Sequence, residues 1–145
     1  MRISVPAFIV CLAVPAAASP LYEASPDPGA TKAAESAFAT ELADAREVGA
    51  MSEVLAWPID LDGDGQAELV GQIFSLFVCG NFNCVFALQP DGAGGFKRLL
   101  FSSGMDAIEV LETRTDGWLD LAVWRPDELG GPVRLVWTGF DYGLR

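Results

Sequence analysis

The sequence predicts an α+β fold in which one N-terminal amphipathic helix packs on an antiparallel β-sheet. Three observations predict it: helical periodicity over residues 32–48, seven short apolar runs after Glu53, and an internal repeat that aligns residues 60–70 with 112–122. The chain has 145 residues, of which 51% are hydrophobic, which is the size of one domain. We expect a single domain over residues 31–145.

Residues 1–18 have the pattern of a secretory signal peptide. Arg2 supplies the positive charge, residues 7–14 (AFIVCLAV) are unbroken apolar, and residues 16–18 (AAA) offer small residues at a cleavage site. The apolar run is too short to span a bilayer as a helix, and the alternative is an N-terminal helix buried in the fold. We expect cleavage after Ala18, which predicts a periplasmic or secreted protein with no membrane attachment after cleavage.

The segment after the cleavage site divides into a leader and a helix. Residues 19–30 are rich in proline and predict an extended leader without a core. Thr31 can cap the helix that follows, and Gly49 can end it. Apolar residues recur at helical spacing on one face of this helix: Ala34, Phe38, Leu42 and Ala45. Such a face needs a sheet or another helix to cover it.

Everything after Glu53 is typical of strands and turns. The runs that we interpret as strands are 54–59, 69–78, 84–89, 96–101, 107–111, 119–124 and 133–138. The 69–78 run is apolar at nearly every position, so we place it centrally in the sheet. The repeat units span about 54–101 and 106–142. Two copies are too few to close a β-propeller, so we expect two related strand–loop–strand units that share one core.

Two cysteines remain after signal removal, because Cys11 lies within the signal. Cys79 and Cys84 flank the turn-forming residues of the segment CGNFNC. In an oxidising exported compartment, an even pair at this spacing predicts a structural disulfide. The alternative is a redox-active pair, although such pairs usually have the tighter C-x-x-C spacing at the start of a helix.

The segment DLDGDGQAE, which begins at Asp60, has the oxygen donors of a site for a hard cation. Asp60, Asp62 and Asp64 occupy positions 1, 3 and 5 of the loop, the Gln66 carbonyl falls at position 7, and Glu68 at position 9. The loop is not an EF-hand, because a strand and not a helix follows it. The alternative is a solvated Asp/Gly turn without metal, whose carboxylates would repel one another.

The segment DLDGDGQAELV resembles the calcium loop of FG-GAP and VCBS-type repeats, and TDGWLDLAV resembles a degenerate second copy. Together with CGNFNC and a closing W-x-G-x-x-Y hairpin, these segments are similar to small exported bacterial proteins of unknown function. The resemblance implies an extracytoplasmic β structure with structural calcium, and it implies no reaction. It implies five calcium ligands: Asp60, Asp62, Asp64, Gln66 and Glu68.

In the second copy of the loop an arginine replaces one aspartate. The residues that align with the four acidic ligands are Glu112, Arg114, Asp116 and Asp120. We expect this pseudo-site to be free of metal, with the Arg114 guanidinium in the place of the cation and the acidic neighbours as its partners. The alternative is that Arg114 points into solvent.

Composition excludes several function classes. The chain has no histidine, which excludes a Ser-His-Asp triad and a histidine-ligated zinc site. Nine Lys+Arg stand against twenty Asp+Glu, and the net charge of −11 argues against nucleic acid as a partner. Four carboxylates are candidates for the acid/base pair of a glycoside hydrolase, but scattered carboxylates are more typical of surface charge: Glu109, Glu112, Asp116 and Asp120. We therefore predict no catalytic residue.

Five aromatic residues gather late in the chain: Trp118, Trp124, Trp137, Phe140 and Tyr142. They indicate either core or a platform for a glycan or a protein. The sequence as a whole predicts an exported, non-enzymatic, calcium-stabilised binding or structural domain. The alternative is a periplasmic inhibitor or immunity-type protein that blocks a basic hydrolase, since negative charge steers association with a basic partner.

Overall fold

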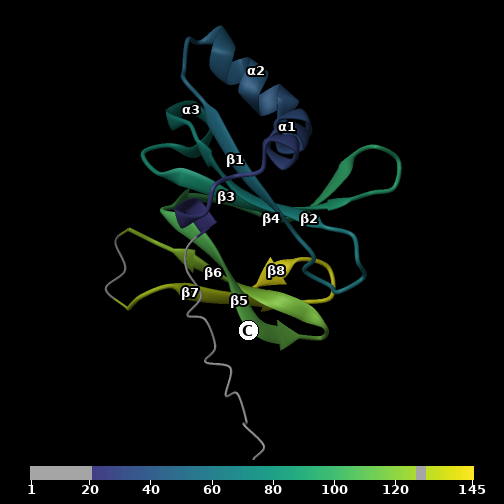
Figure 1. Cartoon of the computed structure of the whole chain (residues 1–145). Helices are drawn as coiled ribbons and strands as arrows, with labels where there is room; N and C mark the ends of the chain where they lie inside the picture. Colours follow the sequence, from purple (N-terminus) through teal and green to yellow (C-terminus); the bar gives the residue numbers. More distant parts are fainter. Residues whose placement is uncertain (1–20, 127–129) are drawn as a thin grey trace, which may run out of the picture.

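The computed structural model describes residues 21–126 and 130–145, in three stacked layers (Figure 1). The predicted signal peptide and the cleavage site after Ala18 lie outside the described residues. The elements in chain order are η1 (Leu21–Glu23), α1 (Pro28–Ala37), α2 (Ala39–Glu47), β1 (Glu53–Ile59), β2 (Glu68–Phe74), α3 (Leu76–Cys79), β3 (Asn83–Pro90), β4 (Phe96–Met105), β5 (Ala107–Thr115), β6 (Trp118–Trp124), β7 (Val133–Trp137) and β8 (Tyr142–Gly143). Within the described part, no helix has the length and apolarity needed to cross a membrane.

The strands form two antiparallel four-stranded sheets, in the orders β1-β2-β3-β4 and β5-β6-β7-β8. Helices α1 and α2 lie on one side of the first sheet, and the second sheet lies on the other (Figure 1). The predicted mixture of helix and antiparallel sheet is confirmed, but the prediction of one sheet is wrong. The physical reason is that the first sheet is apolar on both faces, and helices cover only one of them.

The helical layer confirms the predicted apolar face but not the predicted helix ends. The side chains of Ala34, Phe38 and Leu42 are buried against the first sheet. The segment is two helices that meet at Phe38, and the first begins at Pro28, so the leader is not wholly extended. Asp27 caps it by accepting the Ala30 N–H at 2.7 Å, which leaves the Thr31 hydroxyl to accept the Ala56 N–H of β1.

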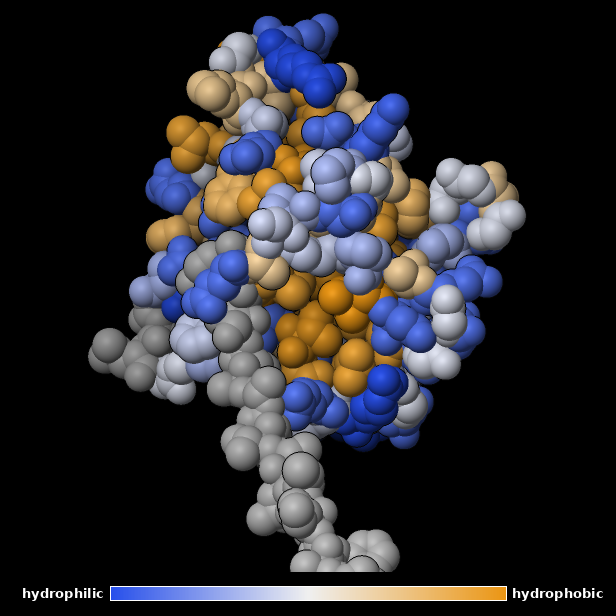
Figure 2. Space-filling model, viewed as in Figure 1, coloured by the Kyte–Doolittle hydropathy of each residue, from blue (hydrophilic) through white to orange (hydrophobic). Residues whose placement is uncertain are grey.

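A second core fills the space between the two sheets. Its buried residues are Leu61, Val70, Val85, Ala87, Leu99, Met105, Ile108, Leu121, Val123, Leu135, Trp137 and Tyr142. Figure 2 shows apolar side chains reaching the surface between the sheets on the face in view. This core holds the two sheets together, because apolar residues of both sheets pack against one another in it.

All seven predicted strands are present, but β2 ends four residues before its predicted end, and β4 and β5 each continue four residues beyond theirs. The sequence missed β8, a strand of two residues. The run 69–78 is not one strand, because β2 ends at Phe74 and the single helical turn α3 follows. Ser75 starts this turn by accepting the Val78 N–H at 3.3 Å through its hydroxyl. The central place of β2 is confirmed, since it lies between β1 and β3 and is almost fully buried.

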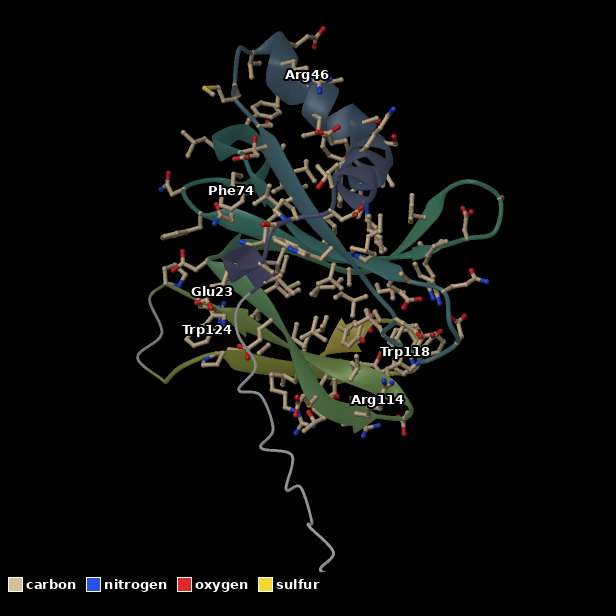
Figure 3. The ribbon with its side chains drawn as sticks, viewed as in Figure 1. Glu23, Arg46, Phe74, Arg114, Trp118 and Trp124 are labelled. Carbon is tan, nitrogen blue, oxygen red and sulfur yellow. A yellow bond between two sulfur atoms is a disulfide. The ribbon has the colours of Figure 1, made fainter. Side chains whose placement is uncertain are left out.

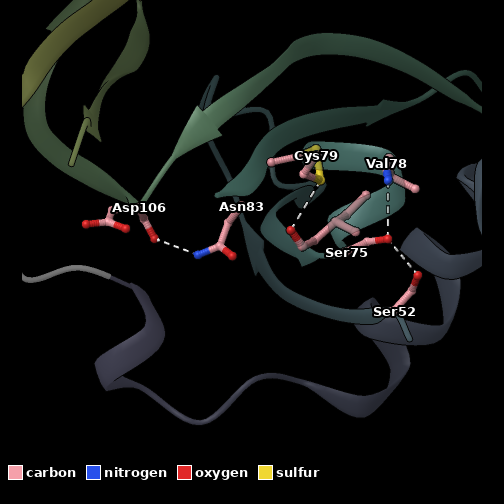
Figure 4. The surroundings of a disulfide bond; sticks show 8 residues. Ser52, Ser75, Val78, Cys79, Asn83 and Asp106 are labelled. Carbon is pink, nitrogen blue, oxygen red and sulfur yellow. Dashed lines mark hydrogen bonds between the residues drawn. A yellow bond between two sulfur atoms is a disulfide. The ribbon is translucent and has the colours of Figure 1, made fainter. Parts of the chain in front are cut away.

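The predicted disulfide between Cys79 and Cys84 is confirmed, with Cα atoms 5.3 Å apart (Figure 4). It joins the end of α3 to the start of β3. Beside it, the Asn83 amide donates to the Asp106 carbonyl oxygen at 3.2 Å. Asp106 directly precedes β5, so this bond ties the first sheet to the start of the second.

Candidate metal centre

The candidate metal site lies in the loop that joins β1 to β2. Ile59 pairs with Glu68 across the hairpin, so residues 60–67 form the loop. Its own carboxylates hold the backbone: Asp60 accepts the N–H groups of Gly63 and Gly65 at 2.8 and 3.1 Å. Both glycines have positive φ, at 78° and 89°, a conformation that other residues adopt at a cost. The two glycines therefore permit the tight coil of this loop.

Three of the predicted ligands converge at the base of the loop. Asp60, Asp62 and Glu68 each offer a carboxylate oxygen, and these oxygens all lie within 4.8 Å of one another. Oxygens bound to one Ca²⁺ at about 2.4 Å lie at most about 5 Å apart, so the separation fits a shared cation. Glu68 is buried, while Asp60 and Asp62 are half-buried, which leaves an approach from solvent.

The electrostatics of this group favour a cation. Burial raises the pKa of Glu68, and the charges of Asp62 and Asp64 add to this rise despite the hydrogen bond from the Leu61 N–H. Burial also raises the pKa of Asp62, and the charges of Asp64 and Asp60 contribute. The raised pKa values mean that the loop disfavours its own negative charge, which a divalent cation would compensate.

The other two predicted ligands are placed differently. The Asp64 carboxylate is not in the converging group, and its Oδ1 accepts the Gln66 N–H at 2.7 Å. Gln66, whose backbone carbonyl is the predicted ligand, is exposed. The side chains present therefore offer three converging carboxylates, a donor set suited to a hard cation.

Sequence reasoning missed the structural role of Leu61. Its side chain is fully buried in the core between the sheets, and its N–H donates to Glu68 at 2.8 Å. Its carbonyl oxygen accepts the Leu119 N–H at 2.8 Å, from the second sheet. The available signal was a single apolar residue between two aspartates, which is out of place in a solvated turn.

The second copy of the motif does not form a loop of this kind. Strand β5 continues to Thr115, which pairs with Trp118, so the connection is the two-residue turn Asp116-Gly117. Both turn residues have positive φ, at 51° and 87°, as in a type I′ hairpin. The four residues of the predicted pseudo-site are therefore distributed over two strands and a tight turn.

Arg114 is exposed, as the alternative interpretation expected, but its guanidinium bonds backbone carbonyl oxygens, which corrects the predicted pairing with the acidic neighbours. Its guanidinium donates to the carbonyl oxygens of Gly117 at 2.6 Å and of Leu61 at 3.2 Å. Asp116 pairs instead with Arg145, at 3.2 Å. Arg114 thus connects the second hairpin to the backbone of the candidate metal loop. Glu112 is exposed on β5.

Asp120, which aligns with Glu68, has cationic and hydroxyl partners. Its Oδ2 accepts the Thr113 hydroxyl at 2.6 Å and a guanidinium N–H of Arg134. Burial alone would raise the pKa of Asp120, but these hydrogen bonds outweigh burial and hold the pKa below its usual value. Glu109 is buried as well and accepts the Trp124 indole N–H at 3.3 Å. Both side chains are buried and have structural partners, so the interpretation of Glu109 and Asp120 as surface charge is wrong.

The five late aromatic residues do not form one platform. Trp118 stacks on Trp137 with ring centroids 4.0 Å apart, and Tyr142 packs edge-on against both. Phe140 is exposed. Trp118 and Trp124 are the first and last residues of β6 and lie at opposite ends of the second sheet (Figure 3). The core interpretation therefore holds for three of them, and Trp124 stands apart.

A scan against protein-family models, a search of curated proteins and a search of solved structures each find no match for this chain. The geometry of the molecule is therefore the basis on which a function can be assigned.

Proposed function

We propose that this chain is an exported, non-enzymatic domain that calcium stabilises and that acts by binding. The observation that carries the proposal is the convergence of Asp60, Asp62 and Glu68 at the end of the β1–β2 hairpin. Calcium suits this group better than magnesium, because calcium tolerates irregular oxygen ligands whereas magnesium demands near-octahedral geometry. The signal-like pattern of residues 1–18 supports export to the periplasm or the medium.

Bound calcium would act on the fold through this loop. Glu68 begins β2 and Leu61 reaches the core between the sheets, so a cation held by the loop would stabilise the contact of both sheets. At a Kd of 10⁻⁴–10⁻³ M, which is typical of extracellular modules, about 1 mM calcium stabilises by about 0.4–1.4 kcal/mol. For a domain of this size that corresponds to a rise in Tm of about 2–6 °C.

The proposal is tested by thermal melting of the purified protein after EDTA treatment. We expect millimolar calcium to raise Tm, magnesium to raise it less, and Asp62→Asn to remove most of the calcium response. Asp91→Asn is the matched control, because Asp91 also stabilises an Asp/Gly turn by accepting N–H groups, including that of Gly95 at 3.0 Å. A Tm that does not respond to several millimolar calcium would overturn the metal proposal.

A second candidate function is an inhibitor or immunity-type protein that blocks a basic hydrolase. It is favoured by the large apolar side chains exposed around α3, where Leu76 is 76% and Phe77 51% exposed beside the disulfide. A constrained apolar protrusion on an acidic protein suits a basic target. The test is whether a basic hydrolase captured from periplasmic extract loses activity in a stoichiometric complex, and whether Phe77→Ser restores that activity.

A further inference from the structure

An open groove lies between three segments at the end of the first sheet that carries the disulfide. Residues 49–51 follow α2, residues 74–76 join β2 to α3, and residues 81–83 lead into β3. Together they line a groove of about 500 Å³. Helices α2 and α3 approach each other on this side (Figure 1). The groove lies at the opposite end of β2 from the candidate metal loop, because Glu68 begins that strand and Phe74 ends it.

Large apolar side chains are exposed along and beside this groove. Of the eight that the described residues expose, five lie on or next to its walls and form what we call the apolar cluster: Val48, Met51, Leu76, Phe77 and Phe82. Met51 is 91% exposed and Phe82 is 45% exposed. Single exposed apolar side chains are normal on a protein surface, whereas a group of them beside a groove indicates a binding surface.

The backbone that carries the apolar cluster is held in place. The disulfide between Cys79 and Cys84 closes the segment that contains Phe82. The Ser52 hydroxyl donates to the Ser75 hydroxyl at 2.9 Å, which ties the segment after α2 to the start of α3 (Figure 4). A surface that is fixed before binding loses less conformational entropy when a partner docks. The groove is therefore preorganised on two of its sides.

Three exposed carboxylates stand around the apolar cluster: Glu47, Glu53 and Asp106. Glu53 pairs with Phe74 across the hairpin, so both side chains lie on the same face of the sheet. Asp106 lies on another side of the groove, where its carbonyl oxygen accepts the Asn83 amide. Over residues 44–53 and 74–83, Arg46 is the single lysine or arginine. The surroundings of the groove are therefore apolar with a net negative charge.

The charge selects among the partners that could cover this surface. A second copy of the chain would bring the same carboxylates to the contact, and the net charge of −11 opposes that association. An anionic membrane surface is repelled for the same reason. A segment of a basic protein has neither disadvantage, because its apolar side chains can be buried while its cations approach the carboxylates.

We infer that the groove binds a segment of a basic protein in which lysines or arginines stand next to apolar side chains. The apolar side chains pack against the apolar cluster, and the cations lie beside Glu47, Glu53 and Asp106. The inference rests on the proposal that the chain acts by binding, and it deepens the second candidate function by naming the surface and the chemistry of its partner. It needs neither bound calcium nor a hydrolase as the partner.

The test is a ¹H–¹⁵N NMR titration of the purified protein with a nine-residue peptide of four lysines, three leucines and two glycines. We expect saturable shifts of the backbone amides of residues 49–51 and 81–83. Replacing the lysines by glutamate should abolish binding, and replacing the leucines by serine should weaken it about tenfold or more. Absence of binding by the lysine–leucine peptide, or equal binding by either control peptide, would contradict the inference.

Matched variants locate the binding. Leu76→Ser should weaken binding of the lysine–leucine peptide about tenfold. Leu144→Ser is its control, because Leu144 follows β8 in the second sheet and is 72% exposed, against 76% for Leu76. Glu53→Gln should weaken binding about two- to fivefold, whereas Glu35→Gln, an exposed position on α1, should not. All four positions are exposed, so the variants should fold, and equal effects within either pair would exclude this groove as the site.

Two measurements identify other occupants of the same surface. Analytical ultracentrifugation should give a monomer, and co-sedimentation should show no binding to phosphatidylcholine vesicles. A dimer that Leu76→Ser converts to a monomer would assign the surface to a second copy of the chain. Vesicle binding that Leu76→Ser abolishes would assign it to a membrane. Either result would overturn the inference.

Peptide binding is measured independently of calcium and of any hydrolase. The lysine–leucine peptide should bind with the same affinity in EDTA, and Leu76→Ser should keep the calcium-dependent rise in Tm. A failed calcium response and a failed peptide titration are therefore told apart. A loss of peptide binding in EDTA would show that the groove depends on the metal loop and would contradict the inference as stated.

Discussion

The β1–β2 and β5–β6 hairpins close in different ways, although their sequences align. In the first, residues 60–67 coil into a loop that brings three carboxylates together. In the second, the strands continue to a two-residue turn, and the aligned acidic residues are separated. The alignment places Thr115 over Gly63. A β-branched residue adopts positive φ only at high cost, so the second copy extends as a strand where the first one coils.

The comparison teaches that acidic spacing alone does not make a cation site. Glu68 and Asp120 occupy aligned positions and are both buried, yet their pKa values shift in opposite directions. Glu68 has carboxylates as neighbours, whereas Asp120 has Arg134 and Thr113. The backbone conformation of each hairpin selects these neighbours, and the neighbours decide whether the site needs an ion.

The largest effect on this comparison is expected from Leu61→Ala. Leu61 is fully buried, and its aligned counterpart Thr113 is exposed, so only the first hairpin inserts a side chain into the core between the sheets. We expect a loss of about 2–5 kcal/mol in the free energy of unfolding, as for other buried leucines. Urea denaturation measures this, and a loss below about 1 kcal/mol would show that the loop does not anchor the sheets.

Asp120→Asn should destabilise the protein at neutral pH by about 1–3 kcal/mol, because it weakens charge-assisted hydrogen bonds to a buried acceptor. The folded-state pKa of Asp120 lies below its usual 3.8, so the charged form contributes stability above that value. That contribution is lost as the pH falls through the lower, folded-state pKa. The difference in unfolding free energy between wild type and variant should therefore shrink below pH 3.8, and a difference constant with pH would contradict this assignment.

Arg114→Ala should lower the free energy of unfolding by about 1–2 kcal/mol, because it removes two hydrogen bonds to carbonyl oxygens, one of which belongs to the first hairpin.

Arg114→Asp should not create a second calcium site, since Thr115 keeps the second hairpin extended. Combining Arg114→Asp with Thr115→Gly restores the glycine and the aspartate of the first loop. If a coiled backbone is what the second copy lacks, isothermal titration with calcium should give one site for Arg114→Asp and two for the double variant.

The elements that the sequence predicted correctly depend on local chemistry. The buried face of α1 and α2 follows from helical periodicity, and the seven strands follow from short apolar runs between Asp/Gly turns. The pair Cys79 and Cys84 could be predicted because the two cysteines are only five positions apart in sequence. The converging group of Asp60, Asp62 and Glu68 could be predicted because its members lie within nine residues of one hairpin.

The errors of sequence reasoning share a different cause. The helix cap is Asp27 and not the predicted Thr31, because the Thr31 hydroxyl accepts the Ala56 N–H of β1 instead. Arg114 was matched with carboxylates nearby in sequence, whereas it reaches Leu61 on another hairpin. In both places a contact between distant segments replaced the local partner that the pattern had indicated.

The sequence by itself determined the turns, the disulfide and the acidic loop, because glycine conformation, short-range closure and ligand spacing act within a few residues. Only the tertiary structure decided that the strands divide into two sheets, because covering both apolar faces of the first sheet requires a partner from elsewhere in the chain. It also decided that Gln72 of the first sheet donates to the Asp106 carbonyl oxygen, directly before the second sheet. Gln72 and Trp124 belong to different sheets, and their proximity arises only when the two sheets pack.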